Sequence, residues 1–186
     1  RKVVEFGQLW YFKIVLYKGF VLYFLYIKKE VFMSTYSSFL ETIEDLYKKN
    51  KIAEALILCF AVIDSISRKV YPNDFSGDRT KKFVDDNFSI ITKYGFPGIN
   101  ASDIQIKIED DVEFDYNFPI PSNRMVRMKD LFYYALRCNL IHEAKVPEGI
   151  IFSERTIIGN WKKEEFILPK AIVEGLRMAI INQLNS

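Results

Sequence analysis

Histidine and cysteine are scarce in this chain of 186 residues, which contains one histidine and two cysteines. Both cysteines, Cys59 and Cys138, lie in apolar helical patterns, so we expect them to be reduced residues of the core. A zinc site would need more ligands than these residues supply, so the sequence predicts neither a metal nor another cofactor. Free thiols are typical of a reducing compartment, which predicts a cytoplasmic protein.

An excess of one charge is also missing, because 26 basic residues stand against 24 acidic ones and the net charge is +2. Nothing therefore draws the whole protein to nucleic acid or to a membrane, and an RNA site would have to be a local basic patch. Hydrophobic residues make up 49% and charged residues 27%, as is usual for a globular protein. The length suffices for one domain with a core.

Residues 1–32 are rich in aromatic side chains but lack a long uncharged run. Their longest one, Gly19 to Ile27, is too short to cross a bilayer as a helix, and no small-residue cleavage site follows it. The first methionine is Met33, where helical patterning begins. We expect residues 33–186 to be the native domain and residues 1–32 to be translated from upstream. The alternatives are a membrane anchor or an aromatic-rich pair of strands.

The first two predicted helices follow Met33, where apolar residues recur at the spacing of an amphipathic helix. One begins near Ser34, with Ser37 or Ser38 as its N-terminal cap. The next covers Ile52 to Val70 and ends before Pro72. Its apolar face contains Leu56, Cys59, Phe60, Ile63 and Ile66.

Three further helices are predicted in the rest of the chain. Asp78 can cap the third, the fourth runs from about Asn123 to Ala144, and Pro169 suits the first turn of the last. The apolar residues on their faces are Phe83, Val84, Phe88, Ile91, Met128, Leu131, Phe132, Ala135, Cys138, Ile172, Leu176, Ala179, Ile180 and Leu184.

Short strands are predicted between these helices. Ile104, Ile106 and Ile108 alternate with polar residues, and residues 150–152 and 156–158 form a predicted hairpin before the last helix. The acidic stretch 109–115 is predicted to be a solvated loop, since its carboxylates lack the spacing of a metal site. The predicted fold is all-α, an up-and-down bundle of about five helices with one small β-hairpin.

The fourth helix carries the main candidate site, because Arg137 stands five positions before His142, the chain's one histidine. Histidine can move a proton near neutral pH, and arginine stays charged and can bind a phosphate through two hydrogen bonds. Together they suit attack of an RNA 2′-hydroxyl on the neighbouring phosphate without a metal. The alternative is that the two residues have a structural role, as helix caps or at the edge of the core, and isolated motifs often have that explanation.

Helix geometry favours a site shared between two subunits. Arg137 and His142 are roughly 140° apart on a straight α-helix, so one subunit aims them poorly at a single phosphate. Asn139 is only about 60° from His142 and is the third candidate catalytic residue, which could hold the ring or contact the phosphate. A twofold axis beside the helix at 123–144 would combine two sets, which predicts an isologous homodimer.

Two other groups of polar residues are candidates for the site. Arg79, Lys81 and Lys82 gather in the first turn of the third helix, where cations oppose the helix dipole, and could bind RNA phosphates. A solvated helix face is the alternative for these cations. Asp64, within the apolar second helix, could be a polar core residue bonded to a neighbour or could orient a group of the site.

The motif and its place late in a helical domain resemble the HEPN superfamily. The chain is similar to bacterial members with Arg-Cys-x-Leu-x-His on this helix, here from Arg137 to His142, over roughly residues 33–186. Its second helix, Leu56 to Tyr71 with Asp64 and Pro72, is similar to theirs as well.

The resemblance implies a helical bundle that dimerises through its motif helices, with Arg137 and His142 as the active pair. It also implies a metal-independent endoribonuclease of toxin–antitoxin or phage-defence systems, with an antitoxin as a possible partner. One residue departs from the pattern, because active members usually have a polar residue where this chain has Cys138. The alternative is a non-catalytic module that binds RNA or nucleotides or that dimerises.

Overall fold

The computed structural model describes residues 35–96, 98, 104–108, 120–147, 149–156, 158–162 and 165–186. The chain divides into two compact units, Arg1–Ser38 and Phe39–Ser186, and the fold below is that of the second. The predictions for residues 1–32 and for the acidic stretch 109–115 lie outside the described residues. Among the described helices, none is long and apolar enough to cross a membrane.

Over the described residues the protein is mostly helical with two small sheets, so the predicted helical class is confirmed in outline. Residues 35–48 are helical, which puts Ser37 and Ser38 inside the helix, and the predicted cap at these serines is wrong. Helix α2, Ile52–Val70, has the predicted bounds. Its predicted apolar face is buried, because the 3.6-residue spacing keeps that face against the other helices.

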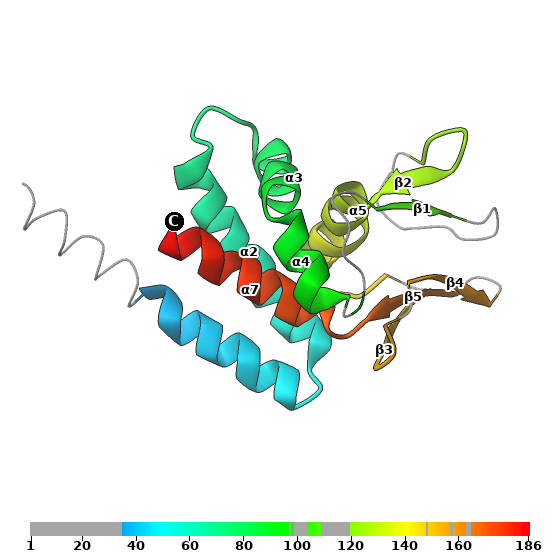
Figure 1. Cartoon of the computed structure of the whole chain (residues 1–186), viewed down its shortest axis with the longest axis horizontal. Helices are drawn as coiled ribbons and strands as arrows, with labels where there is room; N and C mark the ends of the chain where they lie inside the picture. The colour runs from blue at the N-terminus through cyan, green and yellow to red at the C-terminus, as the bar shows by residue number, and fades with distance from the viewer. Residues whose placement is uncertain are drawn as a thin grey trace, which may run out of the picture. The chain divides into compact units, whose positions relative to one another are not determined.

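Helices α2 and α7 lie side by side in the body of the protein (Figure 1). Helix α7 spans Ile172–Asn185, and the apolar face predicted for it is buried. Pro169 was predicted to lie in the first turn of this helix, and that prediction is wrong. Pro169 instead ends strand β5, where it pairs with Ser153. The strand pairing extends the backbone to Pro169, so the helix begins three residues later.

Glycines let α7 pack very closely against α4, Phe88–Gly95. A Cβ atom at Gly175 would lie 2.6 Å from the carbonyl oxygen of Ile91 and 3.0 Å from the Cα of Gly95. These distances are shorter than van der Waals contact, so no larger residue fits at Gly175 without moving the two backbones apart.

The third predicted helix is two helices, α3 at Ser76–Asp86 and α4. The helix is interrupted between them at buried Asn87, whose side-chain amide donates a hydrogen bond to the carbonyl of Phe83 at 3.0 Å. Asparagine competes with the helix for backbone hydrogen bonds in this way. The predicted cap at Asp78 is also wrong, because Asp78 lies inside the first turn and Phe75 holds the cap position.

The first sheet pairs β1, Gln105–Lys107, with β2, Met125–Arg127, in antiparallel register with Ile106 opposite Val126. The strand predicted from the alternating isoleucines is confirmed, and Ile106 and Ile108 are buried. Strand β2 occupies residues that were predicted to be helical. The fourth helix therefore begins at Met128 rather than near Asn123, because residues 125–127 satisfy their backbone in the sheet.

The second sheet has the order β3-β5-β4, with β3 at Ile150–Ser153, β4 at Gly159–Lys162 and β5 at Glu165–Pro169. Strand β5 pairs parallel with β3 and antiparallel with β4. A hairpin does precede the last helix, but it joins β4 to β5 and not residues 150–152 to 156–158 as predicted. The two sheets project to the right of the helices in Figure 1.

The motif helix is continuous but changes its winding along its length. It consists of α5, Met128–Asp130, then η1, Leu131–Cys138, and then α6, Asn139–Glu143. The segment η1 is a π-helix, in which hydrogen bonds join residues five apart rather than four. Ala144, with a φ of 50° in the left-handed region, ends the helix.

Candidate functional site

Arg137 lies in the interior, where three helices meet. Its Nη2 donates a hydrogen bond of 2.6 Å to the Oδ2 of Asp64 on α2. The hydroxyl of Thr80 on α3 donates to the other carboxylate oxygen at 2.9 Å. Arg137 is 7% exposed, Thr80 is 1% exposed, and the side chain of Asp64 is 24% exposed. We call Asp64, Thr80 and Arg137 the buried junction, which joins α2, α3 and η1.

Electrostatics keep the arginine of the buried junction charged. Burial lowers the pKa of Arg137, but the hydrogen bond and the negative charge of Asp64 outweigh burial and raise the pKa above its usual value. Its Nε finds no acceptor among the described residues, so a single carboxylate compensates a largely desolvated cation. Such a pair holds its partners firmly, because removing either one leaves a buried charge uncompensated.

Tyr133 packs beside the buried junction, one turn before Arg137. The guanidinium carbon of Arg137 lies 5.4 Å from the centre of the Tyr133 ring, and the Nζ of Lys81 lies 5.4 Å from the same centre. Gly77 makes room for this ring, since a Cβ atom there would lie 2.6 Å from the tyrosine hydroxyl oxygen. Burial and the side chain of Cys138 raise the pKa of Tyr133, while Arg137 lowers it.

The side chain of Asn139 forms hydrogen bonds within its own helix and does not face an open site. It is buried, and its side-chain amide donates hydrogen bonds to the carbonyls of Ala135 at 3.1 Å and Tyr134 at 3.3 Å. These carbonyls lie four and five residues earlier, where the winding changes from η1 to α6. In this arrangement the amide stabilises the helix, and the predicted contact of Asn139 with a phosphate stays untested.

His142 has the opposite environment, because it is exposed in the last turn of α6. The described structure therefore does not bring the three predicted catalytic side chains into one open site. Arg137 and Asn139 are buried, and only His142 is exposed to solvent. Their catalytic roles remain predictions.

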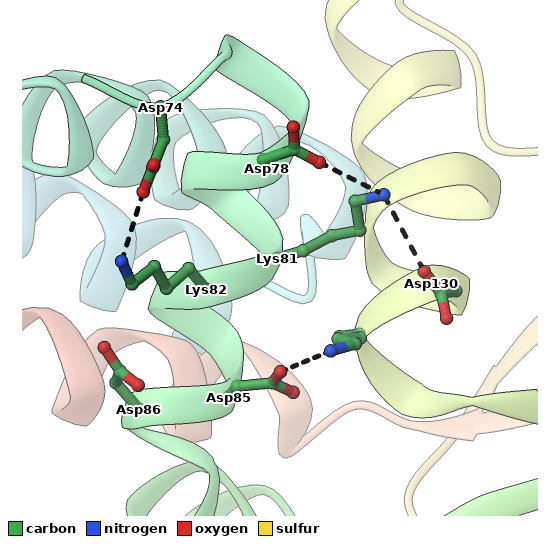
Figure 2. A pocket seen from close by; sticks show the side chains of 8 residues that line it. Asp74, Asp78, Lys81, Lys82, Asp85, Asp86 and Asp130 are labelled. Carbon is green, nitrogen blue, oxygen red and sulfur yellow. Dashed lines mark hydrogen bonds and ion pairs between the residues drawn. The ribbon is translucent and has the colours of Figure 1, made fainter. Parts of the chain in front are cut away.

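The predicted RNA-binding lysines line a hollow of about 520 Å³ between α3 and the start of the motif helix (Figure 2). Lys81 approaches Asp78 at 3.7 Å and Asp130 at 4.0 Å, and Lys82 approaches Asp74 at 3.2 Å. Arg79 is half-buried on α3 and does not line the hollow. We call the hollow's lining residues the charged hollow: Asp74, Asp78, Lys81, Lys82, Asp85, Asp86, Lys129 and Asp130.

Carboxylates outnumber lysines in the charged hollow by five to three. Lys129 is also paired, with Asp85, and Asp86 accepts a hydrogen bond of 2.7 Å from the hydroxyl of Tyr71. An RNA phosphate would therefore compete with aspartates for each of the three lysines. Among the described residues, no three acidic, histidine or cysteine side chains are grouped to hold a metal ion.

The sequence indicated one member of the buried junction besides Arg137 and missed another. Asp64 stood out as a carboxylate in an apolar helix, and its bonding to neighbours agrees with the polar-core alternative. Thr80 gave no signal, because it lies in a polar stretch of α3 between Arg79 and Lys81.

A family model named Rv1289 matches residues 40–185 of the chain. The match includes α2, the motif helix and α7, and hence every residue of the buried junction and of the charged hollow. Comparison with curated proteins and with solved structures gave no match.

Proposed function

We propose that the chain, which belongs to the Rv1289 family, is a HEPN-like helical bundle that acts as a non-catalytic dimerisation module. One observation carries the proposal. Arg137, the arginine of the motif, is 7% exposed and bound to Asp64 within its own subunit. A guanidinium in that position is a structural link between helices, and a phosphate could reach it only by displacing Asp64.

The composition of the charged hollow counts against RNA as its ligand. Each of its lysines already approaches an aspartate, and carboxylates are in excess. Phosphate contacts dominate RNA affinity, so a surface of this composition favours RNA poorly. We therefore choose dimerisation over RNA or nucleotide binding as the role of the module.

The dimer would form through the C-terminal end of the motif helix, where side chains are exposed to solvent. Tyr134 and Ile141 are half-buried on the motif helix, and His142 and Glu143 are exposed. Tyrosine and aliphatic side chains that are partly exposed on one helix suit the core of an isologous interface. In the finer proposal the helices form an up-and-down bundle of about five, and the subunits meet in the cytoplasm, alone or with an antitoxin-like partner.

Light scattering tests the dimer directly. We expect the wild type to be a dimer at tens of micromolar and Ile141→Glu to be a monomer, because the new charge would be buried at the twofold axis. Lys93→Glu, on an exposed position of α4, is the control and should remain a dimer. A monomeric wild type, or a dimeric Ile141→Glu variant, would contradict the proposed interface.

A metal-independent endoribonuclease is the second candidate, favoured by the exposure of His142. In that reaction the RNA 2′-hydroxyl attacks its phosphate and leaves a 2′,3′-cyclic phosphate, and His142→Ala should lower the rate roughly a hundredfold. Wild type and His142→Ala are incubated with total RNA and EDTA. We expect no cleavage by either protein. Cleavage by the wild type that His142→Ala abolishes would replace the non-catalytic proposal with the ribonuclease.

A further inference from the structure

The winding of η1 is unusual for its sequence. Leu131–Cys138 contains no glycine or proline, and leucine, alanine and arginine are good formers of the α-helix. A π-helix is rare and mostly limited to a single turn, yet here it covers eight residues. Local preference therefore favours an α-helix, and contacts with the rest of the protein must select the π-helix.

Tyr133 makes contacts that depend on the π-helical winding. Its side chain meets Arg137, four residues on, and Cys138, five residues on. Residues five apart are neighbours on a π-helix but lie roughly 140° apart on an α-helix. The contact between Tyr133 and Cys138 would therefore be lost if η1 became an α-helix.

The buried junction joins η1 to α2 and α3 through an ion pair and a hydrogen bond. Asp64 holds Arg137 at 2.6 Å, and Thr80 fixes the carboxylate from the other side at 2.9 Å. Asn139 adds hydrogen bonds to the last carbonyls of the π-helical turn, but it lies on the motif helix itself and cannot anchor it to α2. The position of Arg137 against α2 thus depends mainly on Asp64.

We propose that η1 has two registers and that the Asp64–Arg137 ion pair selects the π-helical one. When the pair is lost, η1 tightens into an α-helix, and residues beyond it turn by about one residue, or roughly 100°. The turn separates Cys138 from Tyr133 and changes the face of α6 that carries His142. Loss of the bond to Asp64 would therefore change the orientation of the exposed end of the motif helix. This inference does not depend on the proposed dimerisation.

The two cysteines provide a readout with an internal control. Cys138 is 6% exposed at the end of η1, and Cys59 is fully buried on α2. A change of register should expose the Cys138 thiol alone, whereas general loosening should expose both. The labelling rate of each thiol by iodoacetamide is followed by mass spectrometry of the full chain's peptides.

Two variants remove the ion pair. Asp64→Asn keeps the shape of the side chain but removes its charge, and Asp64→Leu with Arg137→Met replaces both charges with apolar groups of similar size, which folded proteins often tolerate. Thr80 keeps a partner in the double variant, since its hydroxyl also lies 3.3 Å from the carbonyl oxygen of Ser76. Lys82→Met, which removes an exposed pair with Asp74, is the matched control.

We expect labelling of Cys138 to become roughly tenfold faster or more in both variants, since losing a charged hydrogen bond shifts a local equilibrium by that order. Cys59, which is fully buried and labels only when the whole domain unfolds, should remain much slower than Cys138 in both variants, and neither rate should change in Lys82→Met. An unchanged Cys138 rate would overturn the proposal. So would labelling of both thiols at the same rate, including that caused by unfolding of the double variant, because Cys138 would then become accessible only when the whole domain unfolds.

Discussion

Thr80, Lys81 and Lys82 are consecutive on α3, yet they belong to two polar regions that differ in their access to water. Thr80 belongs to the buried junction, where the carboxylate of Asp64 pairs with an arginine that is 7% exposed. Lys81 and Lys82 belong to the charged hollow, where side chains such as Lys82 and Asp74 are 52% and 35% exposed. The Asp64–Arg137 pair, at 2.6 Å, is shorter than the Asp74–Lys82 pair, at 3.2 Å, and its dielectric surroundings are very different.

The difference teaches which charges hold the fold. A buried pair interacts strongly and is costly to break, because the remaining charge has little water to replace its partner. An exposed pair contributes little, because water and salt screen it. We therefore expect loss of the single motif arginine to cost more stability than loss of Lys81 or Lys82, although these lysines lie in a basic stretch of the sequence.

The largest effect is expected from breaking the buried junction. Arg137→Met leaves Asp64 without its cation, so we expect the free energy of unfolding to fall by about 2 to 3 kcal/mol. For a domain of this size the melting temperature should drop by about 5 to 10 °C, measured by calorimetry. A melting temperature within a degree of wild type would mean that Arg137 is free to serve another role.

A smaller effect is expected from the second hydrogen bond of the buried junction. Thr80→Val keeps the side-chain volume but removes the hydroxyl that supports Asp64 at 2.9 Å. We expect a loss of about 1 kcal/mol in the free energy of unfolding, measured by urea denaturation. Thr156→Val, on an exposed position after β3, is a control for the same chemical change. Equal losses in both variants would show that the hydrogen bond to Asp64 contributes nothing specific.

The smallest effect is expected in the charged hollow. Lys82→Met removes the 3.2 Å pair with Asp74, and we expect a change below about 0.5 kcal/mol, since the pair is exposed. Raising the salt concentration should reduce even this difference. A loss as large as that of Arg137→Met would remove the contrast between the two regions.

The parts of the fold that depend on local pattern could be predicted from the sequence. The bounds of α2 follow from its apolar spacing and from Pro72, and β1 follows from the alternating isoleucines. The start of the motif helix could not be predicted, because β2 forms by pairing Val126 with Ile106, twenty residues earlier. For the same reason the parallel pairing of β3 with β5 was missed, since it joins strands that are not adjacent in sequence.

The sequence predicted which helix carries the candidate site, but it did not predict which of the site's side chains are buried. The spacing of Arg137 and His142 identified the motif helix, but spacing does not determine which side chains are buried. The π-helical winding of η1 gave no signal either, because its residues all suit an α-helix. The arginine's partner in the interior, Asp64, lies 73 residues away in sequence, so no local pattern indicates the pair.

The central claim is that the Asp64–Arg137 pair is a structural bond of a kind that the charged hollow does not contain. Two double-mutant cycles measure this directly by urea denaturation, one with Asp64→Asn and Arg137→Met and the other with Asp74→Asn and Lys82→Met. We predict a coupling free energy of about 2 kcal/mol in the first cycle and below about 0.5 kcal/mol in the second. Equal coupling energies in the two cycles would contradict the claim and would leave Arg137 available for the chemistry of the motif.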